Sequence, residues 1–439
     1  MKHGRNNKPI NRRQALKRSL CGGIGVGLVA NQFAVPLVIA DNAAGVDYGT
    51  LQPADANGIK LPAGFTSRVV ATTGLAVGNS DYVWHAAPDG GACFATNDGG
   101  WVYVSNAELT GERGGVGAIR FAHDGSIVDA YPILSGTNGN CAGGPTPWGT
   151  WLSCEEISNG QVYECDPFTP DSQGVVKPQL GTFKHEAAAI DPVHQHVYLT
   201  EDQRNGLLYR FVCDNYPSLD TGVLQAAEIL DPNGDGPIVI GQTRQLAWHQ
   251  VPDPTYTGSV ATRDQVPPAT RFDGGEGCWY EAGLVYFSTK GDDRVWKIDI
   301  AKNEISIVYD AGTLTNPILT GIDNVFVSPT GDVFVAEDTG DMQIVALTTT
   351  GEVVPIVQVT GVSGSEICGP ALSPDGSRLY FSSQRNPGQT FEVSGPWLGH
   401  ADMTTSQLPA LGMIGSGLLS SMIAAYGGLK ARRGGTRRT

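Results

Sequence analysis

The chain has 439 residues, of which 17% are charged and 58 are glycine. Its 29 lysine and arginine residues are outnumbered by 44 acidic residues, so the formal net charge is −15. Such a surface repels phosphate backbones, which excludes nucleic acid as a partner. Seven of the eight cysteines follow residue 40, and they show no CxxC spacing. An odd number cannot pair completely, so we expect at least one functional thiolate.

The first forty residues resemble an export signal. The motif NRRQALK at 11–17 is of the twin-arginine type, and a weakly apolar run at 21–40 follows it. We predict a twin-arginine signal peptide over 1–40, with export by the twin-arginine machinery to the periplasm or the extracellular side. Because this route carries proteins that fold before crossing, it favours a protein loaded with metal. The alternative is a membrane-anchoring helix, which the glycines of the run disfavour.

Residues 41–397 contain a repeated pattern in which an apolar and aromatic strand ends in polar or acidic residues. The six copies lie at 101–106, 150–155, 197–202, 285–290, 333–338 and 379–384. Successive copies are about 46–49 residues apart, except for one interval of roughly 88, and this period is typical of four-stranded propeller blades. The sequence therefore predicts an all-β fold, a six-bladed β-propeller with a metal site at the central channel.

Two other segments bear on the closure of this propeller. The long interval, at about 212–275, is either an insertion or a seventh, degenerate blade, and we favour the insertion because it is rich in Pro, Asp and Gly. A strand at 66–71 has no unit of its own and is expected to complete the last blade, which would close the ring.

The segment 140–156, NCAGGPTPWGTWLSCEE, combines Cys141 with the adjacent acids Glu155 and Glu156. A soft thiolate beside hard carboxylates suits a mixed metal site. Polar side chains end the other copies as well. We expect the recurring strands to line the central channel, so that their ends converge at one mouth of it. These residues are Asn106, Glu201, Asp202, Lys290, Glu337, Asp338, Gln384 and Arg385. Carboxylates gathered at one axis repel one another unless cations lie among them.

Acids also precede several of the recurring strands. They are Glu186 in KHEAAAIDP, Glu276 between glycines, Asp323 in GIDN and Glu366 in GSEICGP. Glu186 could bind a metal, and His185 beside it could be a ligand or a proton donor. The alternative for His185 is an ordinary hydrogen-bonded loop histidine.

Basic residues are scarce, so those beside the acids stand out. Lys290 and Arg385 end two of the recurring strands, and Arg204, Arg271 and Arg294 lie near them in the sequence. An anionic substrate would need such partners, because arginine grips phosphate oxygens with two donors. The alternative for each is a salt bridge that balances the acidic cluster.

The C-terminal segment 398–439 contains an uncharged apolar run at 408–429, followed by five lysine and arginine residues. An apolar run of about 20 residues can span a bilayer, and a basic flank prefers the cytoplasmic side. We therefore expect a membrane tether or a C-terminal sorting signal. The alternative is a glycine-rich tail that packs on the domain.

Several of these segments resemble the PhoX-type alkaline phosphatases. The resemblance rests on 140–156, 184–192, 274–277, 286–292 and 376–385, and it runs in order from about residue 60 to 397. This chain would be a short member of that family. The resemblance implies a six-bladed propeller that holds iron (Fe³⁺) and calcium with an oxo bridge among the metals, and that hydrolyses phosphate monoesters.

Carried over residue by residue, the resemblance implies that Cys141 binds iron and that Lys290 and Arg385 contact the phosphoryl group. It implies carboxylate ligands at Glu156, Glu186, Glu276 and Glu366 and in the pairs Glu201/Asp202 and Glu337/Asp338. Which member of each pair faces the metal stays open. A metal-bound oxide or hydroxide would attack phosphorus in a small phosphoester substrate.

Two other functions fit a propeller with acids at its axis. A calcium-dependent lactonase or esterase needs only a few carboxylates and asparagines there and no thiolate. A non-catalytic surface propeller would use structural calcium and bind protein or glycan at its rim. Iron favours the phosphatase, whereas calcium alone favours the lactonase.

Overall fold

The computed structural model describes residues 46–398. The predicted signal peptide at 1–40 and the apolar run at 408–429 lie outside the described residues. Among the residues described, no helix has the length and apolar character needed to cross a membrane.

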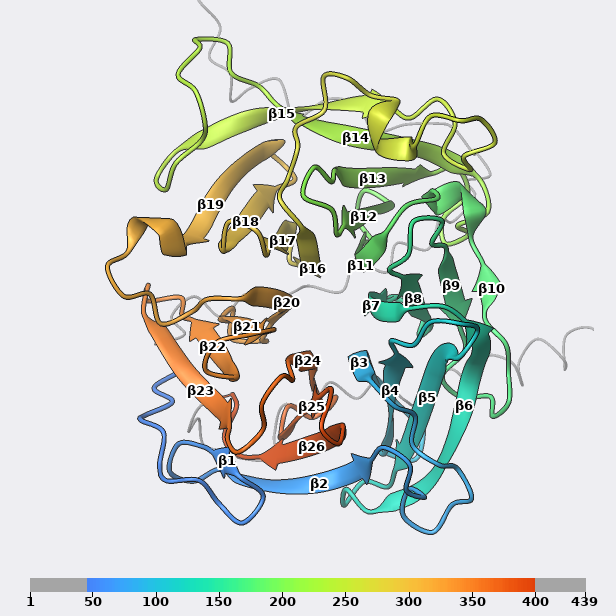
Figure 1. Ribbon diagram of the computed structural model, residues 1–439, viewed down its shortest axis with the longest axis vertical. Coiled ribbons are helices and arrows are strands. Elements are labelled where there is room, and N and C mark those ends of the chain that lie inside the picture. The colour runs from blue at the N-terminus through green and yellow to red at the C-terminus, as the bar shows by residue number, and fades with distance from the viewer. Residues whose placement is uncertain (1–45, 399–439) are drawn as a thin grey trace, which may run out of the picture. The chain divides into compact units, whose positions relative to one another are not determined.

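The described part of the chain is all-β, and its five sheets are arranged around a common centre like the blades of a propeller (Figure 1). The first sheet contains β3 (Pro88–Ala95), β4 (Trp101–Ala107), β5 (Gly114–Phe121) and β6 (Ile127–Thr137). The second contains β7 (Asn140–Pro145), β8 (Trp151–Glu155), β9 (Val162–Cys165) and β10 (Val175–Val176). Both are antiparallel meanders in which consecutive strands pair.

The next sheet in chain order has nine strands. One half contains β11 (His185–Asp191), β12 (His196–Glu201), β13 (Leu208–Cys213) and β14 (Gly222–Ile229). The other contains β16 (Gly275–Glu281), β17 (Leu284–Thr289), β18 (Arg294–Asp299) and β19 (Glu304–Asp310). Strand β15 (Thr243–Gln250) pairs with both β14 and β19 and so joins the two halves. The predicted insertion at 212–275 thus contains β14, β15 and the short 3₁₀ helix η2 (Thr262–Asp264).

The last two sheets each gain a strand from the start of the described chain. One contains β20 (Ile322–Val327), β21 (Val333–Glu337), β22 (Gln343–Leu347), β23 (Val353–Val359) and β1 (Ile59–Lys60). The other contains β24 (Ile367–Leu372), β25 (Arg378–Ser383), β26 (Gln389–Ser394) and β2 (Thr66–Thr72). The pairing of β2 with β26 confirms the expected role of the strand at 66–71. Two more 3₁₀ helices, η1 (Pro178–Leu180) and η3 (Ala311–Thr313), lie in connecting loops.

The strands nearest the centre are β3, β7, β11, β16, β20 and β24, and each contacts the next around the ring (Figure 1). The recurring strands of the sequence are β4, β8, β12, β17, β21 and β25. Counted outward from the centre, each is the second strand of its sheet, or of its half of the nine-stranded sheet, and these six are called the second strands below. The expectation that the recurring strands themselves line the channel was therefore wrong. Second strands have neighbours on both sides, which demands the strong apolar alternation that makes them conspicuous.

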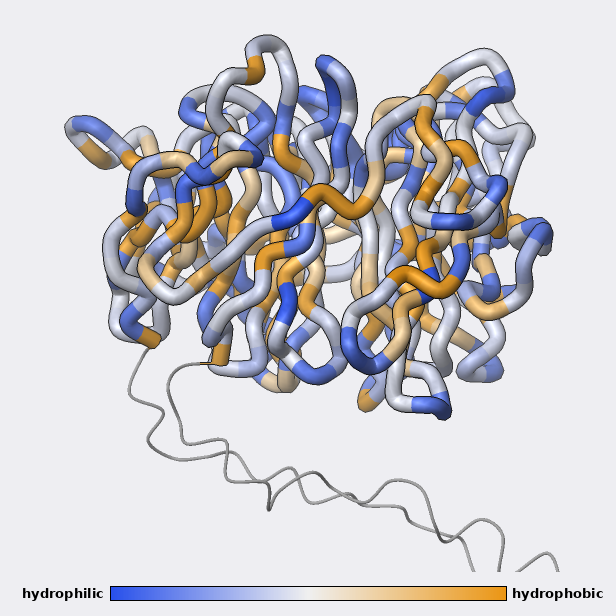
Figure 2. Tube along the Cα trace, turned by 90° about the horizontal axis from the view of Figure 1, so that it is seen from below, coloured by the Kyte–Doolittle hydropathy of each residue, from blue (hydrophilic) through white to orange (hydrophobic). Residues whose placement is uncertain are grey.

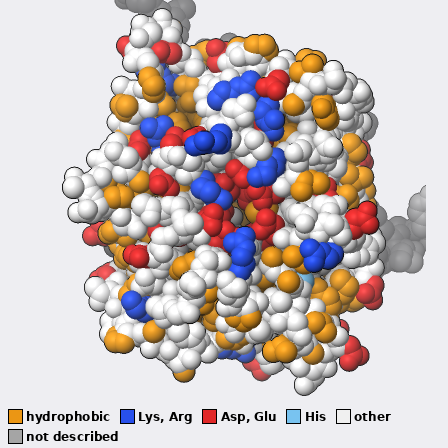
Figure 3. Space-filling view, in the orientation of Figure 1, with side chains coloured by type: hydrophobic (Ala, Val, Ile, Leu, Met, Phe, Trp, Pro, Cys, Tyr) orange, Lys and Arg blue, Asp and Glu red, His pale blue; other side chains and the backbone are white. Residues whose placement is uncertain are grey.

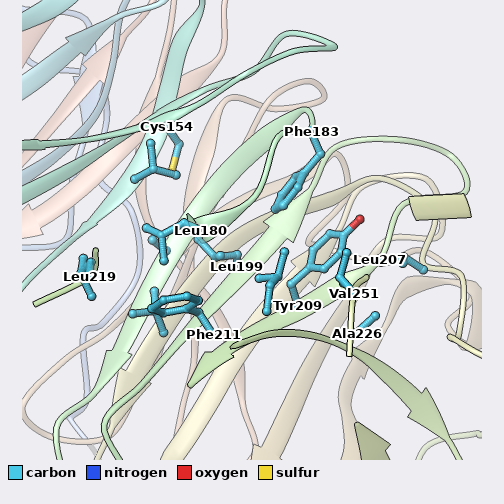
Figure 4. Close-up of a cluster of buried hydrophobic side chains, with 14 of the residues drawn as sticks. Cys154, Leu180, Phe183, Leu199, Leu207, Tyr209, Phe211, Leu219, Ala226 and Val251 are labelled. Atoms are coloured by element: carbon cyan, nitrogen blue, oxygen red, sulfur yellow. The ribbon is translucent and has the colours of Figure 1, made fainter. Parts of the chain in front are cut away.

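Apolar side chains from adjacent sheets pack together in buried clusters. Hydrophobic residues recur within the body of the molecule, and many of the outer loops are hydrophilic (Figure 2). One cluster joins the second sheet to β11–β14 and includes Cys154, Phe183, Leu199, Tyr209 and Phe211 (Figure 4). Burying one such Leu or Phe side chain contributes about 1.5–3 kcal/mol. This packing holds the central strands at fixed positions, as a site built from several sheets requires.

Small residues let the innermost strands approach one another closely. A Cβ atom on Gly144 would lie 1.7 Å from the carbonyl oxygen of Ala188, and one on Gly277 would lie 2.2 Å from the backbone nitrogen of Val325. Only glycine fits at such distances, which explains why glycine stands at these two positions before the recurring strands. Close approach of the backbones brings the first residues of different sheets to one place.

Candidate metal centre and its cavity

Five of the six innermost strands carry one chemically active side chain at the same position, inside a break in register with the second strand. Asp89, Cys141, Glu186, Glu276 and Asp323 occupy this position in β3, β7, β11, β16 and β20. Two residues face one at each break, as in a β-bulge, and a bulge turns a side chain out of the regular alternation. In the last sheet Glu366, directly before β24, supplies the carboxylate instead.

A second set of side chains follows the ends of the second strands and surrounds the first set. Together they line a cavity of about 230 Å³. Its lining residues are Glu108, Cys141, Glu156, Glu186, Glu276, Lys290, Asp323, Asp338, Glu366 and Arg385. Seven of these ten are acidic and only two are basic, so the cavity carries a large excess of negative charge. The acidic hollow with basic groups around it is visible near the centre of the molecule (Figure 3).

The two basic residues that line the cavity each contact several acids. The ammonium of Lys290 lies 3.2 Å from Glu276, 3.1 Å from Asp338 and 3.8 Å from Asp323. Burial alone would lower the pKa of Lys290, but the surrounding carboxylates outweigh it and raise the pKa. Lys290 therefore stays protonated at neutral pH.

The second of these basic residues, Arg385, joins the last sheet to the first. Its guanidinium lies 2.9 Å from Glu366 and 3.6 Å from Glu108. The side chains of Lys290 and Arg385 remain 35% and 45% exposed, so each keeps donors open toward solvent. Both can therefore contact an anion that enters the cavity.

A third cation, Lys184, lies between the second sheet and β12. Its ammonium is 2.6 Å from Glu156 and 2.6 Å from Asp202. The residue directly precedes β11, and its carbonyl accepts a hydrogen bond from the backbone N–H of Asp202. Lys184 thus fixes two carboxylates at the edge of the cavity.

Four groups of three side chains have ligand atoms within 4.8 Å of one another. They are Asp89 with Glu366 and Cys368, Cys141 with Glu156 and Glu186, Glu186 with Glu276 and Asp323, and Asp323 with Asp338 and Glu366. Because Glu186, Asp323 and Glu366 each belong to two groups, the groups form one connected set. A connected set of this kind suits several neighbouring cations better than one.

Two buried oxygens of this set have no hydrogen-bond partner among residues 46–398. Glu186 Oε2 and Glu276 Oε1 are fully buried and accept no hydrogen bond, although Lys290 lies near the latter. The thiol of Cys141 donates to Glu186 Oε1 across 3.1 Å. An unpaired buried carboxylate oxygen is costly, and a bound cation would remove that cost. The donor set therefore fits metal ions, with oxygen ligands for calcium and a thiolate for a softer metal such as iron.

The pKa values of most of these carboxylates are shifted upward. The pKa of Asp338 is lowered instead, because the effect of burial is outweighed by its hydrogen bond with Glu366 and the charge of Lys290. Burial and a hydrogen bond with a neighbouring aspartate raise the pKa of Glu156 to about 8 and that of Glu366 to about 11. Burial, followed by repulsion from nearby carboxylates, raises the pKa of Glu186 and Glu276 well above the ordinary range. A cation among these groups favours their charged forms and opposes the shifts.

Three predicted ligands lie elsewhere, because the first acid of each adjacent pair does not line the cavity. Glu155 accepts the backbone N–H groups of Asn138 and Gln161. Glu337 accepts those of Thr320 and Gln343. Each carboxylate satisfies loop donors at the end of a second strand, which is a structural role.

The third of these residues, Glu201, is fully buried and lies 2.6 Å from the guanidinium of Arg263. It also accepts hydrogen bonds from Tyr209 and from the backbone of Leu207. Its placement, like that of Glu155 and Glu337, differs from the sequence expectation. The second members Glu156, Asp202 and Asp338 face the site.

The structure brings together Cys141, Glu156, Glu186, Glu276 and Glu366, with Lys290 and Arg385 at the same cavity. Asp89, Glu108 and Lys184 were not predicted. Asp89 could have been found, because Asp89-Gly90-Gly91 precedes its recurring strand as Glu276-Gly277 precedes another. His185 stacks on Phe183 and donates a hydrogen bond from Nε2 to the carbonyl oxygen of Gly181, as an ordinary structural histidine does.

A family model described as alkaline phosphatase PhoX matches residues 102–308 and 296–388, which together span more than half of the chain. The chain belongs to this family. It is therefore an alkaline phosphatase, in agreement with the resemblance read from the sequence. No curated protein matches the chain.

Solved structures resemble the described fold. PhoX of Pseudomonas fluorescens, in complex with the transition-state analogue vanadate, matches with a TM-score of 0.66 at 17% identity, over 81% of this chain and 99% of that chain. A gluconolactonase from Xanthomonas campestris matches with a TM-score of 0.44 at 12% identity, over 80% and 98% of the two chains. Regucalcin, a calcium-binding protein from Agrobacterium tumefaciens, gives 0.43 at 13% identity, over 76% and 96%. The first match shows that the two proteins share a fold.

Proposed function

We propose that the protein is an exported, metal-dependent phosphatase that hydrolyses phosphate monoesters at the central acidic cavity. The observation that carries this proposal is the convergence of one thiol and seven carboxylates, from separate strands, on a cavity with only two basic lining residues. So much buried negative charge is stable only with bound cations. The family membership supports the reaction class.

We also propose that the fold is a six-bladed propeller. The two halves of the nine-stranded sheet are each a four-stranded antiparallel meander. Their first strands, β11 and β16, take adjacent places in the ring of central strands. Counting each half as one blade leaves β15 as a strand that links the outer edges of two blades.

The proposed metal ions are iron (Fe³⁺) and calcium. Cys141, Glu156 and Glu186 would hold iron, and Glu276, Glu366 and the acids Asp323 and Asp338 would hold the remaining ions. When bound, the ions would neutralise charge on the phosphoryl group and activate an oxygen nucleophile. The identity of the metals follows from the resemblance to the PhoX-type phosphatases. The donor set is compatible with it, because carboxylate oxygens suit calcium and a thiolate together with carboxylates can bind iron.

Lys290 and Arg385 would bind the phosphoryl oxygens. Both line the cavity, stay protonated and keep part of their side chains open. Arginine can offer two parallel N–H donors to phosphate, whereas lysine acts as a point charge. Donors held in place by carboxylates need no reorganisation when negative charge develops on the equatorial oxygens.

The proposed location is the periplasm or the extracellular side. It rests on the twin-arginine motif at 11–17, and the apolar run at 408–429 is the proposed tether or sorting signal. Comparing cell fractions of a host with twin-arginine export intact and disabled tests this location. Retention of the full-length protein in the cytoplasm of the intact host would contradict it.

The activity is tested on protein loaded with iron and calcium, using p-nitrophenyl phosphate as substrate and elemental analysis of the same sample. We expect hydrolysis, together with iron and calcium in the protein. Cys141→Ala should lose iron and most hydrolysis, while Cys93→Ala, which alters a thiol outside the cavity, should keep both. Full activity of Cys141→Ala would refute the role of the thiol, and lactone hydrolysis with calcium alone would favour the lactonase.

A further inference from the structure

A second cavity, of about 310 Å³, lies on the nine-stranded sheet beside the acidic cavity. The loop between β14 and β15 forms one wall, the segment 270–273 another, and the loop between β17 and β18 a third. Its lining includes Arg204, Ile238, Arg244, Arg271, Phe272 and Trp296. The proposed phosphatase chemistry uses none of these residues.

Two segments of the chain, 202–204 and 290–292, run from the edge of the acidic cavity to the second cavity. Asp202 contacts Lys184 at the edge of the acidic cavity, and Arg204, two residues later, lines the second cavity. Lys290 lines the acidic cavity and Asp292, two residues later, lines the second. Two residues span at most about 7 Å of chain. A molecule held by its phosphoryl group in one cavity can therefore extend into the other.

The second cavity has an apolar floor and a rim of four arginines. Phe272 and Trp296 are both buried and pack edge to face, with ring centroids 5.5 Å apart. A binding pocket of this type combines apolar surface with a few placed polar groups. The floor suits a planar or apolar group rather than a second metal ion.

The arginines of the rim differ in how firmly the protein already engages them. Arg244 and Arg294 form close ion pairs with aspartates of the wall. Arg204 has a side chain that is 94% exposed, and its nearest acidic atom, on Asp273, is 3.8 Å away. Arg271 is 35% exposed and lies 3.6 Å from an acid. These two guanidinium groups have donors to spare for a ligand anion.

The arginines of this cavity are unusual in a protein with an excess of acidic residues. Acidic residues outnumber basic ones across the chain, yet four arginines and only three aspartates line this cavity, and two of the aspartates pair with Arg244 and Arg294. Basic side chains lie directly beside the acidic hollow on the same face (Figure 3). A cluster of this sign on an acidic protein attracts an anionic group to a defined place.

We propose that this cavity, the leaving-group pocket, binds the part of the substrate that departs after hydrolysis. The ligand class is an organic phosphate whose leaving group carries an apolar or planar body and a second anionic group. The body lies on Phe272 and Trp296, and the anion pairs with Arg204 and Arg271. This inference rests on the proposed function, because it takes the acidic cavity as the place of the reacting phosphoryl group.

Two matched substrates test the pocket with the metal-loaded enzyme. 4-(Carboxymethyl)phenyl phosphate carries the second anion, and 4-(2-hydroxyethyl)phenyl phosphate is its neutral counterpart with a similar leaving oxygen. We expect kcat/KM to be about tenfold higher for the carboxylate, which is the effect of one charge-assisted contact. In the double variant Arg204→Gln/Arg271→Gln, the ratio of the two values should fall to about one.

Lys302→Gln is the matched control for loss of positive charge. Lys302 lies on the same sheet, in the turn between β18 and β19 at the opposite end of β18 from Arg294, and is 67% exposed. We expect this variant to keep the wild-type ratio. Equal kcat/KM for both esters in the wild type, or an equal loss of preference in both variants, would overturn the proposal.

A binding measurement separates this inference from the proposed function. Calorimetry with 4-(carboxymethyl)benzylphosphonate, which cannot be hydrolysed, should show binding about tenfold weaker in the double arginine variant than in the wild type. If the wild type hydrolyses neither ester, the proposed function fails, and the phosphonate still decides the pocket. Unchanged phosphonate affinity in the variant would overturn the pocket even where both esters are hydrolysed.

Discussion

Adjacent acids at the ends of three second strands serve two different regions of the molecule. The first members, Glu155, Glu201 and Glu337, accept hydrogen bonds from loops and neighbouring side chains. The second members, Glu156, Asp202 and Asp338, face lysines and the candidate ligand groups. Successive side chains of a strand point in opposite directions, so a step of one residue separates a structural role from a functional one.

The largest effect expected from this comparison is on catalysis. Glu156 shares a candidate ligand group with Cys141 and Glu186, whereas Glu155 bonds only to backbone donors. We expect Glu156→Gln to lower kcat/KM by at least about 1,000-fold, because even the loss of an outer partner of a metal ligand costs about 10- to 100-fold. Steady-state kinetics with p-nitrophenyl phosphate measures the change.

Glu155→Gln is the matched control, since it removes the same charge one residue away. It should keep iron and most activity while lowering the melting temperature. Equal losses of activity in the two variants would show that Glu155 and Glu156 do not differ in role.

The next effect is on stability and concerns a first member. Glu201 is fully buried, and Arg263 and Tyr209 depend on it for partners. We expect Glu201→Gln to lower the free energy of unfolding by about 3 kcal/mol, as for other buried pairs that lose one partner. Urea unfolding provides the measurement. Glu228→Gln, which affects a partly exposed contact with His249, should cost much less.

The sequence allowed the repeat, the closing strand and most of the site to be predicted, because each depends on a local pattern. It identified Cys141, Glu186 and Glu276 from their position before recurring strands. It did not show that those strands are second from the centre. Most of the innermost strands are rich in glycine and alanine, and all of them are broken by shifts in register, so their periodicity is weak.

The sequence also did not show which acid of each adjacent pair faces the cavity. Alternation alone does not say which side of a strand end faces the cavity when both neighbouring residues are acidic. Glu108 escaped notice because β4, which it follows, ends in asparagine and alanine rather than in an acidic pair. Lys184 joins Glu156 to Asp202 only through the packing of two different sheets.

A smaller effect should follow from removing the cation that separates two second members. In Lys184→Met, the carboxylates of Glu156 and Asp202 lose a charge that lies 2.6 Å from each. We expect calcium binding to become about tenfold tighter, because an added divalent ion would replace the lost charge. Titration of metal-stripped protein by calorimetry, with elemental analysis, measures affinity and stoichiometry.

Lys177→Met is the control for that variant. Lys177 also joins two acids, Glu164 and Asp220, each at 3.0 Å, but it lies outside the acidic cavity. Its loss should leave calcium affinity unchanged. If both variants behave alike, the effect of Lys184 is a general consequence of net charge.

The smallest expected effect is the pH dependence of stability in metal-stripped protein. Burial raises the pKa of Glu156 from 4.5 to about 8 and that of Asp323 from 3.8 to about 6. A raised carboxyl pKa favours the folded state while the group is protonated, so this stability is complete below the unfolded pKa. It is lost as pH rises through the folded pKa. At full value the two shifts correspond to about 5 kcal/mol between pH 5 and pH 8. Water in the metal-free cavity screens part of them, so we expect the free energy of unfolding to fall by about 1–2 kcal/mol over this range.

Two comparisons distinguish this cause from a general effect of charge. Added calcium should reduce or reverse the loss of stability at pH 8, because a cation favours the ionised carboxylates. In metal-stripped Glu156→Gln, the slope between pH 6 and pH 8 should be smaller than in the wild type, since that amide does not titrate. The first acids of the pairs should contribute less to this pH dependence. Glu155→Gln should therefore keep most of the wild-type change in unfolding free energy with pH. A wild-type slope of the opposite sign would mean that the cavity carboxylates are already ionised in the metal-free fold, with Lys184, Lys290 and Arg385 sufficient to balance them.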